Sequence, residues 1–104
     1  MKQVAFEMKL LPNNQEEYKK RHDEIWPSLV GVLKQSGISD YSIFLNPKTD
    51  SLFGVLSIKD ELKIDELPKN PIMQKWWAYM KDIMETHPDN SPVSMPLIKV
   101  FFMP

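Results

Sequence analysis

The spacing of the apolar residues changes along this chain, and the order of those changes limits the fold more than any other feature. Residues 3–11 alternate apolar and polar side chains, which is the period of a strand with one buried face. Residues 14–36 then carry apolar side chains every three to four positions, as an amphipathic helix does. Ser36 and Gly37 predict the end of that helix, and Pro27 predicts a kink or a restart inside it.

A β-hairpin is predicted in the middle of the chain. Residues 41–46 and 51–58 are rich in β-branched and aromatic side chains, and residues 46–50 (NPKTD) between them are typical of a turn. Both predicted strands carry apolar side chains on both faces. One face must pack against helices, so the other needs a second cover.

The last third of the chain predicts a helix and a final strand. Asp60 can cap a short helical segment that ends before Pro68. Asn70 is a better helix cap, because a proline follows it at the first helical position, and an apolar stripe then continues to about residue 86. Residues 97–102 (LIKVFF) have the composition of a strand.

The predicted order is therefore β-α-β-β-α-β, the ferredoxin-like plait of the α+β class. A chain of 104 residues argues for a single domain over residues 1–104. The uncovered apolar face of the predicted sheet suggests a homodimer that stacks two sheets.

Composition excludes several classes of function. Thirteen basic and fourteen acidic residues nearly cancel, which argues against a nucleic-acid partner. An RNA-recognition module shares the predicted order, but SLFGVLSI lacks the basic residue of its sheet motif. The chain has no cysteine, no metal-binding motif and no glycine-rich phosphate loop, so acid–base work on a small neutral ligand is what remains possible. Glu7 and Lys9 interrupt the N-terminal apolar residues, which argues against a signal peptide or a membrane span and favours a cytoplasmic protein.

His22 is the main candidate for chemistry. It lies one helical turn after Tyr18, on the apolar stripe of the predicted helix. A histidine in such a place is often a hydrogen-bonded core residue. An imidazole also titrates near neutral pH, so it can act as a general acid or base in a small aromatic pocket.

Three other aromatic residues are candidates for binding a ligand. Trp76 and Trp77 are adjacent, and each combines a flat apolar face with an N–H donor. Tyr41 begins a predicted strand, and its hydroxyl needs a partner if it is buried. Packing is the more common role for such a tryptophan pair, whereas Tyr41 is ambiguous. His87 precedes a proline in a polar loop, which is typical of a solvated residue.

The sequence closely resembles the L-rhamnose mutarotase family over nearly its whole length. No single piece of the resemblance is diagnostic, and the specificity lies in the joint occurrence of the pieces, in order and at matching spacing. The pieces are Glu17-Tyr18, Arg21-His22, Ile25-Trp26-Pro27, Val32-Leu33-Lys34, Asp40-Tyr41, Trp76-Trp77, Tyr79-Met80, PDNSPVS at 88–94, and Val100-Phe101.

The resemblance implies a dimeric, cofactor-free enzyme of the dimeric α+β barrel type that interconverts the α and β anomers of L-rhamnose. It implies that His22 is the proton donor and that Tyr18, Tyr41, Trp76 and Trp77 bind the sugar. Its partner base is not identifiable from the sequence, although Asp89 in the matching loop is one candidate.

Two alternatives stay open at this point. The same dimeric fold hosts cofactor-free and haem-dependent monooxygenases, by an analogy of fold alone. A non-catalytic dimeric module, in which the histidine and the tryptophans only pack, is what residue patterns alone would favour.

Overall fold

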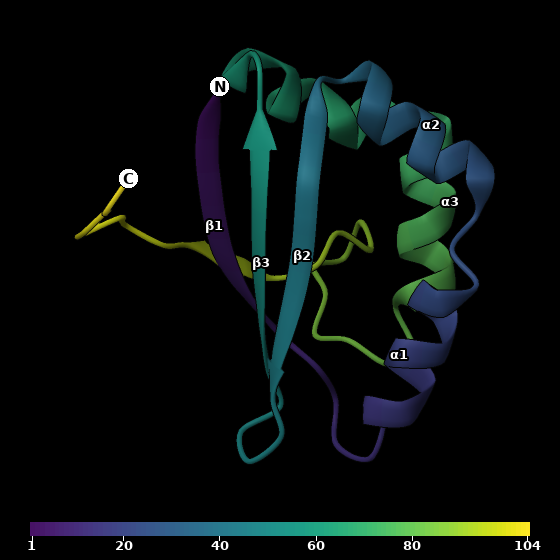
Figure 1. Cartoon of the computed structure of the whole chain (residues 1–104). Coiled ribbons are helices and arrows are strands. Elements are labelled where there is room, and N and C mark those ends of the chain that lie inside the picture. The colour runs from purple at the N-terminus through teal and green to yellow at the C-terminus, as the bar shows by residue number, and fades with distance from the viewer.

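The computed structural model describes all 104 residues as a sheet with helices on one of its faces (Figure 1). The order of elements confirms the predicted ferredoxin-like α+β fold. The elements are β1 (Lys2–Lys9), α1 (Gln15–Asp23), α2 (Pro27–Gln35), β2 (Ile38–Asn46), β3 (Ser51–Ile58), the 3₁₀ helix η1 (Glu61–Lys69), α3 (Pro71–Met80) and β4 (Ser94–Pro96).

The four strands are antiparallel in the order β2-β3-β1-β4. The helices cover one face of this sheet, the inner face, and leave the outer face uncovered (Figure 1). Because side chains alternate along a strand, every second residue points to the inner face. Phe6, Gly54 and Ile43 are directly paired across β1, β3 and β2 and share the inner face. Phe53 and Phe44 are paired on the outer face, where Phe44 is exposed.

Proline and asparagine begin the helices as the sequence predicts. The chain restarts at Pro27, so residues 14–36 form two helices, α1 and α2, rather than one kinked helix. The Asn70 side chain accepts hydrogen bonds from the backbone N–H groups of Ile72 and Met73. Asp60 caps η1 in the same way through Leu62, and η1 continues to Lys69.

Several predicted boundaries are wrong: β2 begins at Ile38 rather than at residue 41, and η1 runs past Pro68 instead of ending before it. Helix α3 ends at Met80, six residues before the predicted end. Residues 83 and 84 continue the apolar stripe because they are buried in the core from a turn, and Met84 forms an isolated bridge with Leu10. The apolar spacing that predicted a longer helix therefore indicates which residues are buried, not where the helix ends.

The final strand is also displaced. Strand β4 comprises residues 94–96 only, and the predicted strand 97–102 has no ladder partner in this chain. After the Leu97 N–H bonds the Ala5 carbonyl, the chain leaves the sheet, and the C-terminal segment points away from the helices (Figure 1). The apolar side chains of residues 98–103 are largely exposed.

The main core lies between the inner face of the sheet and the helices. Its buried members are Met8, Leu10, Tyr18, Leu29, Leu52, Trp76, Met80, Ile83 and Met84. None of the helices has the length and apolar character needed to cross a membrane.

Candidate active site

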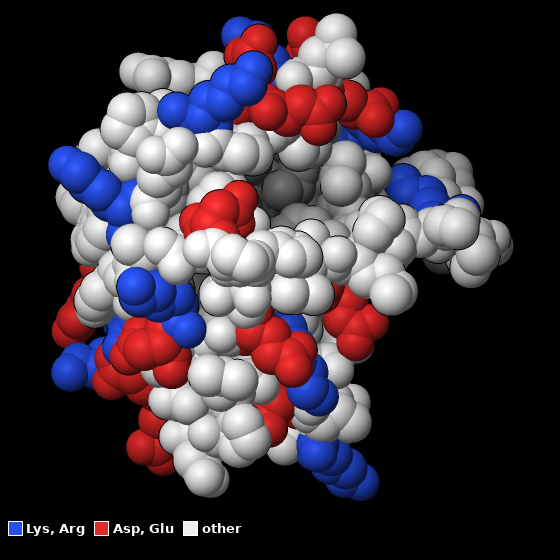
Figure 2. Space-filling view, turned by 180° about the vertical axis from the view of Figure 1, so that it is seen from behind, with Lys and Arg blue, Asp and Glu red and all other residues white.

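A cavity of about 910 Å³ opens between the inner face of the sheet and the helices. Its size is within the range of small-molecule sites, about 300–1,000 Å³. Most of the residues that line it are hydrophobic. The lining includes all five residues that the sequence singled out: Tyr18, His22, Tyr41, Trp76 and Trp77. Figure 2 shows a hollow on this side of the molecule with mostly uncharged walls. The fold thus brings together five residues from three separate segments of the sequence.

Helix α1 presents Tyr18 and His22 to this cavity one turn apart. Their ring centroids are 4.3 Å apart, with the rings tilted by 31°. Tyr18 is buried in the core, and burial raises the pKa of its hydroxyl, with a smaller contribution from Tyr41. At neutral pH the Tyr18 hydroxyl is therefore a protonated hydrogen-bond donor.

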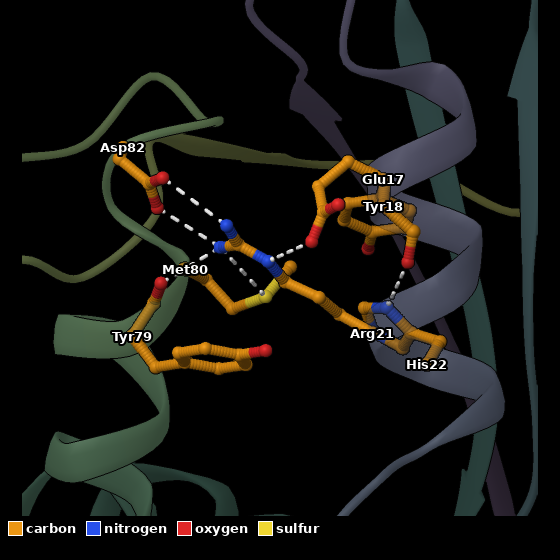
Figure 3. Close-up of polar contacts among 7 residues, drawn as sticks. All are labelled: Glu17, Tyr18, Arg21, His22, Tyr79, Met80 and Asp82. Atoms are coloured by element: carbon orange, nitrogen blue, oxygen red, sulfur yellow. Dashed lines mark hydrogen bonds and ion pairs between the residues drawn. The ribbon is translucent and has the colours of Figure 1, made fainter.

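The backbone fixes which nitrogen of His22 is free. Nδ1 lies 3.1 Å from the Tyr18 carbonyl oxygen (Figure 3). A carbonyl only accepts hydrogen bonds, so Nδ1 carries the proton in the neutral ring and Nε2 has the lone pair. Burial lowers the pKa of His22 from 6.5, while the Tyr18 carbonyl and Asp23 partly oppose that effect. Nε2 is therefore the atom that can exchange a proton with a ligand.

Helix α3 supplies the indole wall of the cavity. Trp76 is buried, and its ring meets His22 edge-on at a centroid distance of 5.4 Å. Trp26, from the turn before α2, packs edge-on against Trp76 at 5.0 Å, and both contact Tyr79. Trp77 is half-buried and makes none of these ring contacts, although it lines the cavity. Trp76 is thus held in an aromatic cluster, whereas Trp77 lines the cavity and packs against no other aromatic ring.

Tyr41 enters the cavity from β2. Tyr41 lines the cavity and exposes 39% of its surface. Burial nonetheless raises the pKa of its hydroxyl to about 12, because the polar end points inward. The Phe6 ring packs against it edge-on at 6.2 Å. The two tyrosines therefore offer neutral hydroxyls for a ligand.

Two further residues beside the site were not singled out from the sequence. Beside His22 and Trp77, a recess of about 80 Å³ is also lined by Thr86 and Asn90. Asn90 has a positive φ of 73°, and its N–H bonds the His87 carbonyl, so the turn that carries it is well defined. In the sequence, residues 88–94 carry part of the family resemblance and Asp89 is a candidate base, but Thr86 and Asn90 are not singled out as ligand-facing residues.

Two loop residues lie outside the site. His87 is exposed and does not line the cavity. Asp89 is also exposed, and hydrogen bonds from the Ser91 side chain and backbone hold the pKa of its carboxyl below the usual range. The structure therefore does not place Asp89, the candidate partner base, among the groups that face a ligand. The chain has no cluster of three or more His, Cys, Asp or Glu side chains that could hold a metal ion.

Comparison with known proteins agrees with this geometry. An L-rhamnose mutarotase family model matches residues 3–103. The chain is 63% identical over 99 residues to an L-rhamnose mutarotase of Mesorhizobium japonicum, covering 95% of this chain and 94% of that one. It is 57% identical over 104 residues to the corresponding protein of a Jannaschia species, with full coverage of both chains.

Solved structures give the same result. A crystal structure of an L-rhamnose mutarotase from Formosa agariphila superimposes with a TM-score of 0.93 at 44% identity, with full coverage of both chains. A putative antibiotic biosynthesis monooxygenase from Chloroflexus aurantiacus shares only the fold, with 12% identity and a TM-score of 0.53 over 98% of this chain and 95% of that one. This chain belongs to the L-rhamnose mutarotase family.

Proposed function

We infer that this protein is an isomerase that interconverts the α and β anomers of L-rhamnose. The match to the family over residues 3–103 supports the substrate and the reaction. The observation that carries the chemistry is the position of His22, whose Nε2 is the free ring nitrogen in an aromatic cavity that also holds two neutral tyrosine hydroxyls. These are the groups that acid–base work on a small, neutral, hydroxylated ligand needs.

The proposed reaction opens and recloses the sugar ring. The His22 imidazolium gives its Nε2 proton to the ring oxygen, and the C1–O5 bond breaks with its electron pair going to that oxygen. The anomeric hydroxyl loses its proton to water or to a second side chain as the aldehyde forms. Rotation about C1–C2 then exposes the other face of the aldehyde. Reclosure reverses the proton transfers and returns the proton to Nε2, so atoms and charge balance without a cofactor.

The tryptophans and tyrosines would hold the sugar in this scheme. The face of Trp77 that packs against no other aromatic ring suits the apolar face of a 6-deoxy sugar, including its methyl group. Trp76 would form the rigid wall beside the imidazole. Tyr18 and Tyr41 would donate hydrogen bonds to sugar hydroxyls, since both stay protonated at neutral pH.

Magnetisation transfer between the two anomeric proton signals of L-rhamnose tests this proposal directly. We expect the wild-type protein to accelerate exchange and folded His22→Ala to lose about 10²–10⁴-fold of that acceleration. His87→Ala is the matched control, because it removes the other histidine at an exposed loop position outside the cavity. Normal turnover by His22→Ala would refute the role of His22, and no acceleration by folded wild type would refute the reaction.

The pH profile separates the two roles that an imidazole can take. If His22 donates the proton, kcat/KM falls as the pH rises above the His22 pKa. If it instead removes the proton of the anomeric hydroxyl, kcat/KM falls as the pH drops below that pKa. We expect the first profile, because the proposal makes His22 the donor to the ring oxygen, and since burial lowers the pKa of His22, the fall in kcat/KM should begin at a lower pH than for a free imidazole.

We also propose that the protein is a cytoplasmic homodimer in which the C-terminal segment, residues 97–104, contacts the second copy. Two independent features support an apolar partner surface. Ile98 and Val100 expose 86% and 93% of their surface, and the outer sheet face presents Phe44 and Phe53. Burying each large apolar side chain contributes about 1.5–3 kcal/mol to the free energy of association. Covering these side chains with a second copy would therefore favour the dimer.

Sedimentation of the full chain and of a chain ending at Pro96 tests this assembly. We expect a dimer for the full chain and a monomer for the truncated one. A monomeric full chain at micromolar concentration would contradict the proposal.

A further inference from the structure

Arg21 joins α1 to the end of α3 through all three nitrogens of its guanidinium group (Figure 3). Nε lies 2.8 Å from Glu17 Oε2 on α1. Nη1 donates to the Tyr79 carbonyl at 2.8 Å, and the two terminal nitrogens bind the Asp82 carboxylate at 2.9 and 3.1 Å. The guanidinium carbon lies 4.5 Å from the Tyr79 ring centroid. The Arg21 side chain is only 11% exposed, and it lies between Glu17 of α1 on one side and Tyr79 and Asp82 on the other.

The two elements that Arg21 joins carry the two halves of the site. Helix α1 carries His22, and α3 carries Trp76. Helix α1 is short, its cap Asn14 forms no side-chain cap bond, and Tyr18 is its one buried residue. Tyr18 packs in the core with Trp76, and the His22 ring meets Trp76, but the side-chain hydrogen bonds that join α1 to the end of α3 all come from Arg21.

The chemistry of the contact suits a rigid joint. The Tyr79 carbonyl belongs to the last turn of α3, where backbone carbonyls lack helical partners and a cation is favoured. The bidentate contact with Asp82 fixes the plane of the guanidinium group as well as its position. Hydrogen bonding to Asp82 and Glu17 raises the pKa of Arg21, so the group stays charged.

We propose that Arg21 is a positioning residue that fixes the imidazole of His22 against the indole of Trp76 and so sets the geometry of proton transfer to the sugar. This proposal rests on the mutarotase function proposed above. Arg21 acts through α1 and does not line the cavity. The pKa of His22 responds to burial, the Tyr18 carbonyl and Asp23, so the effect of Arg21 is on position rather than on acidity.

The test compares Arg21→Ala and Arg21→Lys with the wild-type protein. A misplacement of about 1 Å can cost roughly 10²-fold in rate, so we expect kcat to fall about ten- to hundredfold in both variants. KM should change less, and the pKa in the pH profile should stay where it is. Lysine keeps the charge but not the planar fork, so Arg21→Lys should not restore the rate.

Lys2→Ala is the matched control. Lys2 on β1 forms an ion pair of 2.8 Å with Glu61 on η1, so it also joins two elements, but neither residue lines the cavity. We expect wild-type kcat from this variant. Guanidinium ion below denaturing concentration should restore part of the rate of Arg21→Ala and should not raise that of Lys2→Ala. A folded Arg21→Ala with wild-type kcat, or a loss explained entirely by its unfolded fraction, would overturn the proposal.

A second readout does not depend on activity. Nuclear Overhauser contacts between the His22 ring and the Trp76 indole report their separation, which is 5.4 Å between centroids. We expect these contacts to weaken in both Arg21 variants and to persist in Lys2→Ala. Unchanged contacts in folded Arg21→Ala would overturn the positioning role even if the protein proved to act on another substrate.

Discussion

Gly54 and Gly31 should respond to alanine with opposite signs, because their surroundings differ. A Cβ atom on Gly54 would lie 2.4 Å from Phe6 Cζ and 2.6 Å from Phe6 Cε2, closer than atoms can approach. A Cβ atom on Gly31, inside α2, meets nothing within 4 Å. One site is filled by an aromatic ring from the neighbouring strand, and the other is open.

The magnitudes follow from this geometry. Overpacking typically costs about 1–3 kcal/mol, and the 2.4 Å contact places Gly54→Ala in the upper part of that range, about 2–3 kcal/mol. Replacing a strand glycine returns up to about 1 kcal/mol, so Gly54→Ala should destabilise by roughly 1–2 kcal/mol. Gly31→Ala should stabilise by about 0.5–1 kcal/mol through helix propensity. At about 4–8 °C per kcal/mol, Tm should fall by roughly 4–16 °C for Gly54→Ala and rise by roughly 2–8 °C for Gly31→Ala.

Thermal unfolding at a fixed protein concentration measures both changes. Phe6→Leu provides the decisive background, because a leucine side chain does not extend over Gly54 as the ring does. We expect most of the cost of Gly54→Ala to vanish in that background, which a double-mutant cycle measures as coupling. An equal cost in both backgrounds, or a Tm raised by Gly54→Ala alone, would show that the Phe6 contact is not the cause.

Three further changes test other parts of the structure. Asn90→Gly keeps a residue that accepts positive φ but removes the side chain of Asn90, which lines the recess beside His22. KM for the sugar should therefore rise roughly two- to tenfold, the effect of one lost hydrogen bond. Steady-state kinetics with an unchanged KM would show that Asn90 does not bind the sugar, and Asn13→Gly is the control at an exposed positive-φ position. Asn70→Ala should lower the free energy of unfolding by about 1 kcal/mol in denaturant titrations, since two N–H groups of α3 lose their cap. Because burial lowers the pKa of folded His22, the unfolded chain binds the proton first, so the free energy of unfolding should fall as the pH drops below about 6.5, and His22→Gln should flatten that decline.

The sequence by itself determined the order of elements and most of their starting points. Apolar residues that recur every second position indicate a strand, and those that recur every 3.6 positions indicate a helix, because these are the spacings of side chains on one face of each element. Pro27, Asn70 and Asp60 began elements where expected, because their backbone and side-chain chemistry acts within a few residues. The sequence also indicated His22 and the aromatic residues as candidates, since an imidazole on an apolar stripe is visible without coordinates.

The tertiary structure decided what depends on long-range contact. The apolar stripe could not reveal that α3 stops at Met80, because burial of residues 83 and 84 continues the pattern in a turn. The strand composition of residues 97–102 could not distinguish pairing within the chain from an apolar segment left free of it. Nor could spacing show that Arg21 joins α1 to α3, since its partners Tyr79 and Asp82 lie about sixty positions away. Helix caps and turns depend on residues that are close in the sequence, so the sequence predicts them. The site is assembled from three segments that are far apart in the sequence, so it forms only when the chain folds.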